Sequence, residues 1–139
     1  MKTVFVDSSV LFSAVNSPIG GSSKIFTLKN VKLVTSRVVL IETERNVRNK
    51  LRDYHLERFF MLVEKLEVLK QLPNSQLIKK AKKVIVGKDS VILAESYKSK
   101  ADFLVTLDLK HFLTGSVARF LRPQKALTPK MLIEMVEKK

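Results

Sequence analysis

VFVDSSVL, residues 4–11, is the stretch that decides the fold of this chain, because an apolar segment there runs into an acid and two hydroxyls. Residues 2–6 are rich in β-branched and aromatic side chains, which predicts a strand. A helix is expected to follow from Ser8 to Ala14. Asp7 stands between the two, so its carboxylate either caps the helix or performs chemistry at the end of the strand.

Segments typical of strands and of helices alternate along the rest of the chain. Further strands are predicted at 31–36, 66–70, 102–107 and 117–121. Helices are predicted at 23–29, 37–52, 54–64, 75–86, 90–99 and 128–137, with turns at 16–21 and 108–112 and a break at 72–75. This alternation predicts an α/β fold, in which a mostly parallel sheet carries helices on both faces.

The composition indicates one globular domain over residues 1–139, with 45% apolar residues to build its core. The chain contains no cysteine, which excludes disulfides and thiolate metal sites. That usage suits a reducing compartment, so we expect a cytoplasmic protein. No apolar run is long enough to span a membrane, and Asp7 interrupts the one segment that resembles a signal peptide.

The formal net charge of +13 is the most informative property of the composition. A basic domain of this kind is attracted to polyanions, and nucleic acid is the leading candidate partner. The alternative is a lysine-rich surface that serves solubility. The run KKAKK at 79–83 is interpreted mainly as the solvated face of a helix, although its charge would strengthen attraction to RNA.

Four acids are placed where they can meet. Asp7 and Asp108 follow predicted strands, and the carboxyl ends of parallel strands line the crevice that binds ligands. Asp89 and Glu42 lie in the first turns of predicted helices, whose N-termini point toward the same crevice. Clustered carboxylates repel one another, which a bound cation relieves, and their oxygens suit Mg²⁺ or Mn²⁺ better than zinc. A carboxylate-held metal in a basic protein indicates phosphate-ester chemistry.

Each acid also has a simpler interpretation. Asp7, Asp89 and Asp108 can be helix N-caps, and Glu42 can be an ordinary surface residue. Glu42 also shares a helical face with three polar residues that could hold a phosphate chain beside a metal, or could form a solvated stripe with an intrahelical ion pair. These residues are Arg45, Asn46 and Asn49.

Four segments and the closing segment together resemble the PIN domain family over almost the whole chain. The segments are VFVDSSVLFSAV (4–15), VVLIETERNV (38–47), KDSVILAES (88–96), ADFLVTLDLKHF (101–112) and LTPKMLIEMV (127–136). The resemblance implies a PIN-like three-layer sandwich around a five-stranded sheet of order 3-2-1-4-5. It also implies a metal-dependent endoribonuclease, either the toxin of a toxin–antitoxin pair or an RNA-processing enzyme.

The resemblance assigns roles residue by residue. It makes Asp7, Glu42, Asp89 and Asp108 the catalytic metal ligands, with Mg²⁺ or Mn²⁺ as cofactor. Ser8, Ser9 and Thr106 would support them. Asp102 either contacts the site or only starts a strand. The chemistry requires no histidine, so His55 and His111 are expected on the surface or in packing.

The implied partners are RNA, a second copy of the chain, and an antitoxin or RNA-processing protein. The broad apolar face of helix 54–64 suggests a surface that a partner buries. The alternative function is a non-catalytic PIN-like module that binds RNA or a partner. A phosphoacceptor domain is disfavoured, because Asp7 stands alone after the first strand and Ser9 occupies the position where a second aspartate is needed.

Overall fold

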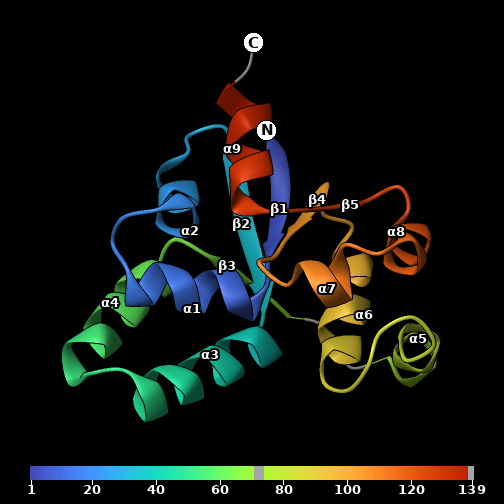
Figure 1. Ribbon diagram of the computed structural model, residues 1–139, viewed down its shortest axis with the longest axis horizontal. Coiled ribbons are helices and arrows are strands. Elements are labelled where there is room, and N and C mark those ends of the chain that lie inside the picture. Colours follow the sequence, from blue (N-terminus) through green and yellow to red (C-terminus); the bar gives the residue numbers. More distant parts are fainter. Residues whose placement is uncertain (71–73, 138–139) are drawn as a thin grey trace.

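A five-stranded sheet forms the centre of the molecule, in a computed structural model that describes residues 1–70 and 74–137 (Figure 1). Its order is β3-β2-β1-β4-β5, and all four neighbouring pairs are parallel, which confirms the predicted topology. The strands are β1 Lys2–Val6, β2 Val31–Ser36, β3 Glu67–Leu69, β4 Phe103–Val105 and β5 Lys125–Leu127.

Helices cover both faces of the sheet and complete a three-layer sandwich (Figure 1). They are α1 Ser8–Asn16, α2 Gly21–Lys24, a 3₁₀ turn Ile25–Thr27, α3 Arg37–Lys50, α4 Asp53–Val63, α5 Ser75–Ala81, α6 Asp89–Ser99, α7 Leu109–Phe112, α8 Gly115–Leu121 and α9 Pro129–Glu137. On one side α1 packs against α2, α3 and α4. On the other side α6 packs against β2, α5 and α8.

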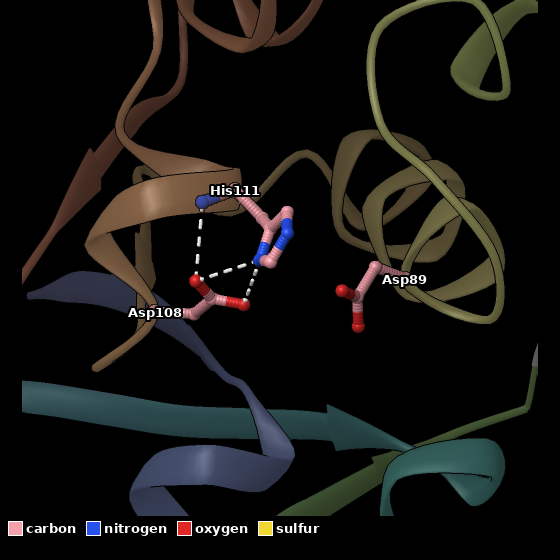
Figure 2. A group of neighbouring side chains, drawn as sticks. All are labelled: Asp89, Asp108 and His111. Carbon is pink, nitrogen blue, oxygen red and sulfur yellow. Dashed lines mark hydrogen bonds and ion pairs between the residues drawn. The ribbon is translucent and has the colours of Figure 1, made fainter.

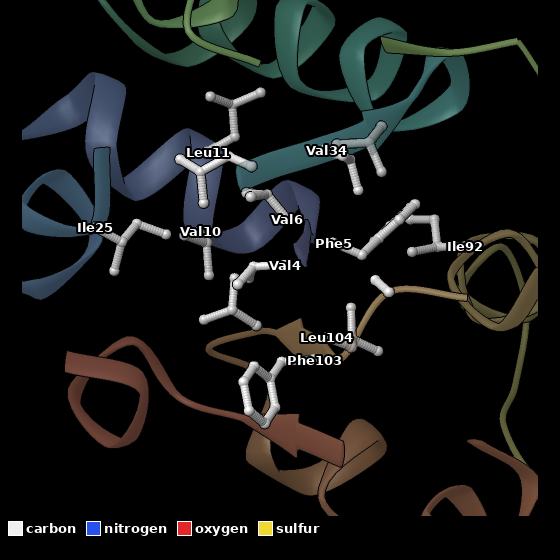
Figure 3. Close-up of a cluster of buried hydrophobic side chains, with 14 of the residues drawn as sticks. Val4, Phe5, Val6, Val10, Leu11, Ile25, Val34, Ile92, Phe103 and Leu104 are labelled. Atoms are coloured by element: carbon white, nitrogen blue, oxygen red, sulfur yellow. The ribbon is translucent and has the colours of Figure 1, made fainter. Parts of the chain in front are cut away.

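The central strand β1 has apolar side chains on both of its faces. Val4, Phe5 and Val6 are fully buried. Side chains alternate along a strand, and Figure 3 shows Val4 and Val6 on the side of Val10 from α1, with Phe5 on the side of Ile92 from α6. A strand covered on both faces reads as a continuous apolar run, which explains why residues 4–6 locate the centre of the sheet.

The predicted strand at 117–121 is wrong, because these residues belong to α8. The Thr114 hydroxyl caps this helix by accepting a hydrogen bond from the Val117 amide at 3.1 Å. Val117 and Leu121, one turn apart, are both fully buried. The fifth strand is instead β5, which pairs with β4 through Leu104 and Ala126. The predicted strand order 3-2-1-4-5 is still correct, but its fifth strand is β5.

Other elements differ from the prediction at their ends. The helix expected over 75–86 ends at Ala81, and the one expected over 23–29 is split into α2 and the 3₁₀ turn. The strand expected over 102–107 covers only β4, so residues 106–108 form a loop at its carboxyl end. Residues 72 and 73 of the predicted break lie outside the described residues, and Asn74 and Ser75 are the N-cap and the first residue of α5.

The two edges of the sheet differ in what they carry. The carboxyl ends of the strands lead directly into Asp7, into α3 and into the loop at 106–108. At the amino edge, Met1 lines a shallow hollow together with Met135 and Val136 from the end of α9. Among the described residues, no helix has the length and apolar character needed to cross a bilayer.

Candidate active site

Asp7 occupies the N-cap position of α1, but its side chain makes no capping hydrogen bond. Its Oδ2 instead accepts hydrogen bonds from Ser9 Oγ and Thr106 Oγ1, both at 2.7 Å. The side chain is only 3% exposed. Burial raises the pKa of Asp7, and the hydrogen bonds from Ser9 and Thr106 oppose that rise. The carboxylate is therefore held by one hydroxyl from the first turn of α1 and one from the loop after β4, and it does not cap the amides of the helix.

The same two hydroxyls also fix the loop that follows β4. Ser9 Oγ accepts a hydrogen bond from the Leu107 amide at 3.0 Å, and Thr106 Oγ1 accepts one from the Asp108 amide at 3.1 Å. Each hydroxyl thus accepts from the loop and donates to Asp7 Oδ2. Among the residues that the structure describes, the one side-chain hydrogen bond to the other oxygen, Oδ1, comes from Ser8 Oγ at 3.5 Å. Oδ1 is therefore the oxygen that remains available for a ligand.

Glu42 lies in the second turn of α3 and points back toward the start of α1. Ser8 Oγ donates a hydrogen bond to Glu42 Oε1. Lys88 Nζ lies 3.3 Å from Glu42 Oε2. The Glu42 side chain is only 15% exposed, so it is not an ordinary surface residue. Ser8 lies next to Asp7 and bonds to Glu42, which places the two acids side by side.

Asp108 caps α7, as its simpler interpretation predicts, because Oδ1 accepts a hydrogen bond from the His111 amide at 3.1 Å. The His111 ring also contacts this carboxylate, with Nδ1 2.9 Å from Oδ2. His111 was expected only on the surface or in packing. The structure places its half-buried ring against one of the four predicted acids.

Asp89 is the first residue of α6, and it does not cap that helix, whose N-cap is Lys88. Within the described parts of the chain, no hydrogen bond to its carboxylate is found. Ligand atoms of Asp89, Asp108 and His111 lie within 4.8 Å of one another. Figure 2 shows the carboxylates of Asp89 and Asp108 on either side of the His111 ring.

The charges of the other three acids act on Asp89. Burial raises the pKa of Asp89 first, and the negative charges of Asp7, Asp108 and Glu42 raise it further. The charge of His111 has the opposite effect. The acids that follow β1 and β4 and the acids in α3 and α6 therefore act electrostatically on one another at the carboxyl edge of the sheet.

Asp102 lies at the opposite end of β4 from this cluster. Its Oδ2 accepts a hydrogen bond from the Thr3 amide at 2.8 Å, and its backbone bonds to β1 and β5. Asp102 therefore ties three strands together at the amino edge. Of the two roles that the sequence allowed, the structure places it at the start of a strand.

The polar face of α3 reaches solvent beyond Glu42. Arg45 and Asn49 are exposed and Asn46 is half-buried. The intrahelical ion pair of α3 joins Glu44 Oε2 to Arg48 Nε at 2.9 Å, while Glu42 bonds to other elements. The three polar residues thus extend outward from the acid cluster along one helix.

His55 and Lys88 illustrate what the sequence could and could not indicate. His55 Nδ1 accepts a hydrogen bond from the Arg52 amide at 3.2 Å, and its ring stacks on Tyr54, which fits the expected packing role. Lys88 was not singled out, although it immediately precedes Asp89 in the sequence. For His111, the available signal was its position three residues after a capping aspartate.

The donor set fits a hard divalent cation. Asp89 has no hydrogen-bond donor among the described residues, and the three neighbouring acids raise its pKa. Asp7 keeps one oxygen nearly free of side-chain donors. Cations such as Mg²⁺ and Mn²⁺ take carboxylate oxygens as ligands and would relieve the mutual repulsion.

Comparison with known families identifies the class of protein. The sequence profile of the PIN domain matches residues 4–113. The chain therefore belongs to the PIN domain family. No curated protein matches it.

Solved structures share the fold at low sequence identity. VapBC2 from Rickettsia felis, bound to a promoter DNA fragment, is 18% identical with a TM-score of 0.71, over 91% of this chain and 98% of that one. A toxin–antitoxin complex from Klebsiella pneumoniae is 14% identical with a TM-score of 0.65, over 91% of this chain and 97% of that one. The sarcin–ricin loop cleaving toxin VapC20 from Mycobacterium tuberculosis is 18% identical with a TM-score of 0.60, over 81% of this chain and 95% of that one.

Proposed function

We propose that this chain is a divalent-metal-dependent endoribonuclease that hydrolyses RNA phosphodiesters. The observation that carries the proposal is the clustering of Asp7, Glu42, Asp89 and Asp108. Ser8 links Asp7 to Glu42, and Thr106 links Asp7 to Asp108. Ligand atoms of Asp89 and Asp108 lie within 4.8 Å of each other. A fold with no use for a cation would gain stability by separating these charges. Membership of the PIN domain family supports the same conclusion.

The four acids of the cluster are the proposed metal ligands. Asp7, Glu42, Asp89 and Asp108 would hold Mg²⁺ or Mn²⁺. When bound, the ion supplies an activated water and a positive charge beside the phosphate.

Neighbouring side chains would hold the acids in place. Ser9 and Thr106 orient Asp7, and Ser8 orients Glu42, through the hydrogen bonds that they donate. His111 orients Asp108. The polar residues of α3, Arg45, Asn46 and Asn49, would bind the RNA backbone beside the acids.

We also propose that the enzyme is the toxin of a toxin–antitoxin pair. Structures with this fold include VapBC complexes and a toxin that cleaves the sarcin–ricin loop. The proposed partners are accordingly RNA and an antitoxin, which would bind in the cytoplasm. If a small DNA-binding protein is encoded beside this chain, co-expression of the two tests this role. Formation of a stable complex that suppresses cleavage is expected, and cleavage that the neighbour leaves unchanged would contradict the toxin role.

Replacement of Asp7 by Asn tests the catalytic proposal. RNA incubated with wild-type protein should be cleaved when Mg²⁺ or Mn²⁺ is present and left intact in EDTA. Asp7→Asn should abolish cleavage, because it removes a charged ligand from the cluster. Asp53→Asn, at an exposed aspartate in the first turn of α4, is the matched control and should cleave normally.

Two outcomes would count against an enzyme. Cleavage that persists in Asp7→Asn would come from another site or a contaminant. Wild-type protein that binds RNA without cleaving it, with or without metal, would instead support the alternative of a non-catalytic binding module.

We further propose that the protein forms a homodimer through α4. Phe60 and Met61 are 49% and 50% exposed on this helix, which is unusual for adjacent large apolar side chains. Light scattering should give a dimer for the wild type and a monomer for a variant that carries Phe60→Lys and Met61→Lys. A monomeric wild type would remove the proposal.

A further inference from the structure

Lys88 is a positively charged residue placed at the acid cluster by the backbone. Gly87 adopts a left-handed conformation with φ of 62°, and Ser90 bonds to its carbonyl through both its amide and its hydroxyl. This turn makes Lys88 the N-cap of α6, immediately before Asp89. Its side chain crosses to α3, where Nζ lies 3.3 Å from Glu42 Oε2.

The two ends of this ion pair lie in different surroundings. The Glu42 side chain is 15% exposed, whereas the Lys88 side chain is 74% exposed. Ion pairs with a solvated partner are weak, and the four-carbon stem of lysine is flexible. Lys88 therefore partly neutralises a crowded group of carboxylates without being fixed there, and its ammonium can leave while the backbone stays in place.

We propose that Lys88 is an exchangeable counter-ion of Glu42, which an incoming divalent cation displaces and which then binds a phosphate of the nucleic acid. The inference rests on the proposed metal site. The ammonium and a divalent ion both need the oxygens of Glu42, and they repel each other when close. Once displaced, the ammonium remains beside Asp89, where a lysine can bind phosphate as a point charge.

This arrangement predicts opposite effects on two ligands when the charge is removed. Lys88→Gln eliminates the competitor for Glu42, so the metal should bind more tightly. The same change eliminates a phosphate contact, so nucleic acid should bind more weakly, but only when the metal has released Lys88 from Glu42. A lysine that served merely to stabilise the fold would not produce these opposed effects.

The first measurement is Mn²⁺ binding by isothermal titration calorimetry. Lys88→Gln should bind Mn²⁺ roughly threefold to tenfold more tightly than wild type, with a smaller gain at high salt. Lys88→Arg keeps the charge and should resemble wild type. Lys29→Gln removes the same charge at an exposed position on the opposite edge of the sheet, and should change the affinity less than about twofold.

The second measurement uses a fluorescein-labelled single-stranded DNA, which presents the same phosphate charge, with its integrity checked on a gel. Fluorescence anisotropy in EDTA should give similar affinities for wild type and Lys88→Gln. In Mn²⁺, Lys88→Gln should bind about threefold to tenfold more weakly than wild type. It should also lose about 0.7 from the magnitude of the salt slope, which corresponds to one contact with a single strand.

The outcomes separate this inference from the proposed function. Equal or weaker Mn²⁺ binding by Lys88→Gln, with normal binding by the wild type, would overturn the counter-ion role and leave the metal site intact. An equal loss of DNA affinity in EDTA and in Mn²⁺ would overturn the exchange. Wild-type protein that binds no Mn²⁺ would overturn the proposed function together with this inference.

Discussion

Asp7 and Asp108 both stand immediately before a helix, yet their carboxylates are held in different ways. Asp108 caps α7 through the His111 amide, whereas Asp7 leaves the amides of α1 without a side-chain cap and accepts hydroxyl donors instead. An aspartate that forgoes its cap, at a cost of about 1 kcal/mol, needs another use. The proposed metal site would supply that use, because the carboxylate lies among three other acids.

The contact between His111 and Asp108 predicts a role in metal affinity. If Nδ1 donates its proton to Asp108, the ring holds the carboxylate in one orientation, and residues that orient ligands change metal affinity by about 10-fold or more. His111→Ala should therefore bind Mn²⁺ about 10-fold more weakly by calorimetry. His111→Asn, whose amide can replace the Nδ1 donor, should retain most of the affinity.

The control for this prediction is His55→Ala. His55 caps the start of α4 and does not contact the acids, so its loss should leave Mn²⁺ affinity unchanged. Normal Mn²⁺ binding by His111→Ala would show that Asp108 is held well enough by its own cap.

Helix α6 carries an acid at its middle that no metal role explains. Glu95 lies where α6 packs on the end of β2, and its Oε1 is buried without a hydrogen-bond partner in the described structure. Burial raises the pKa of Glu95, while hydrogen bonding with Ser36 and the charge of Lys98 oppose the rise. The helix thus retains a carboxyl group that holds its proton more tightly than a glutamate in the unfolded chain does.

This acid predicts how the stability of the protein depends on pH. A carboxyl group with a raised pKa in the fold contributes stability at low pH, which is lost as the pH rises through that pKa. Relative to Glu95→Gln, wild type should therefore lose stability as the pH rises from about 4.5, the ordinary pKa of a glutamate, toward neutrality. Solvent screening keeps the loss small, about 2 °C in Tm.

Thermal melts of both proteins in EDTA across this pH range provide the measurement. The difference in Tm between Glu95→Gln and wild type should grow steadily toward neutral pH. A constant difference would mean that folding leaves the pKa of Glu95 unchanged, and a difference that shrinks toward neutral pH would mean that the fold stabilises Glu95 as an anion; either result would contradict the prediction. Met131→Leu, on the exposed part of α9, is a control whose difference from wild type should not vary with pH.

The elements that sequence patterns predicted well are those with long or buried apolar runs. Residues 4–6 identified the central strand, because burial on both faces leaves an uninterrupted apolar signal. β5 spans three residues and buries only Leu127 well, so its pattern is too short to read. The segment VARFL was predicted to be a strand because it contains β-branched and aromatic residues. It forms α8 instead, and Thr114 caps the start of this helix.

The candidate site was predictable to the extent that it follows from topology. Parallel strands and their following helices bring Asp7, Asp89 and Asp108 to one edge, so the order of elements is enough to group them. Lys88 and His111 could not be assigned in this way. Their roles depend on side-chain directions across α3, α6 and α7, which only the packed structure provides.

The charge of the whole molecule is divided unevenly over its surface. The chain carries 26 basic and 13 acidic residues, and four of those acids gather at one edge of the sheet. The remaining surface is therefore strongly cationic. Such a surface attracts nucleic acid without regard to sequence and is weakened by salt.

The affinity of the protein for RNA should therefore depend on the salt concentration. In EDTA, the affinity of the wild type for single-stranded RNA should fall steeply between about 50 and 200 mM salt, with a logarithmic slope near −0.7 for each phosphate contacted. Replacing the four lysines of residues 79–83 by Gln tests whether the end of α5 and the turn after it contribute to this attraction. Affinity that does not change with salt would show that the net charge of the protein has no part in RNA binding.

The placement of Met1 has a practical consequence for the study of this protein. Met1 and the last turn of α9 lie together at the edge of the sheet opposite the acids (Figure 1). A biotin or a tether attached at either place would therefore leave the cluster facing the bulk solution. Immobilisation on a sensor chip should preserve access for metal ions and long transcripts, which makes single-molecule observation of cleavage feasible without redesigning the protein.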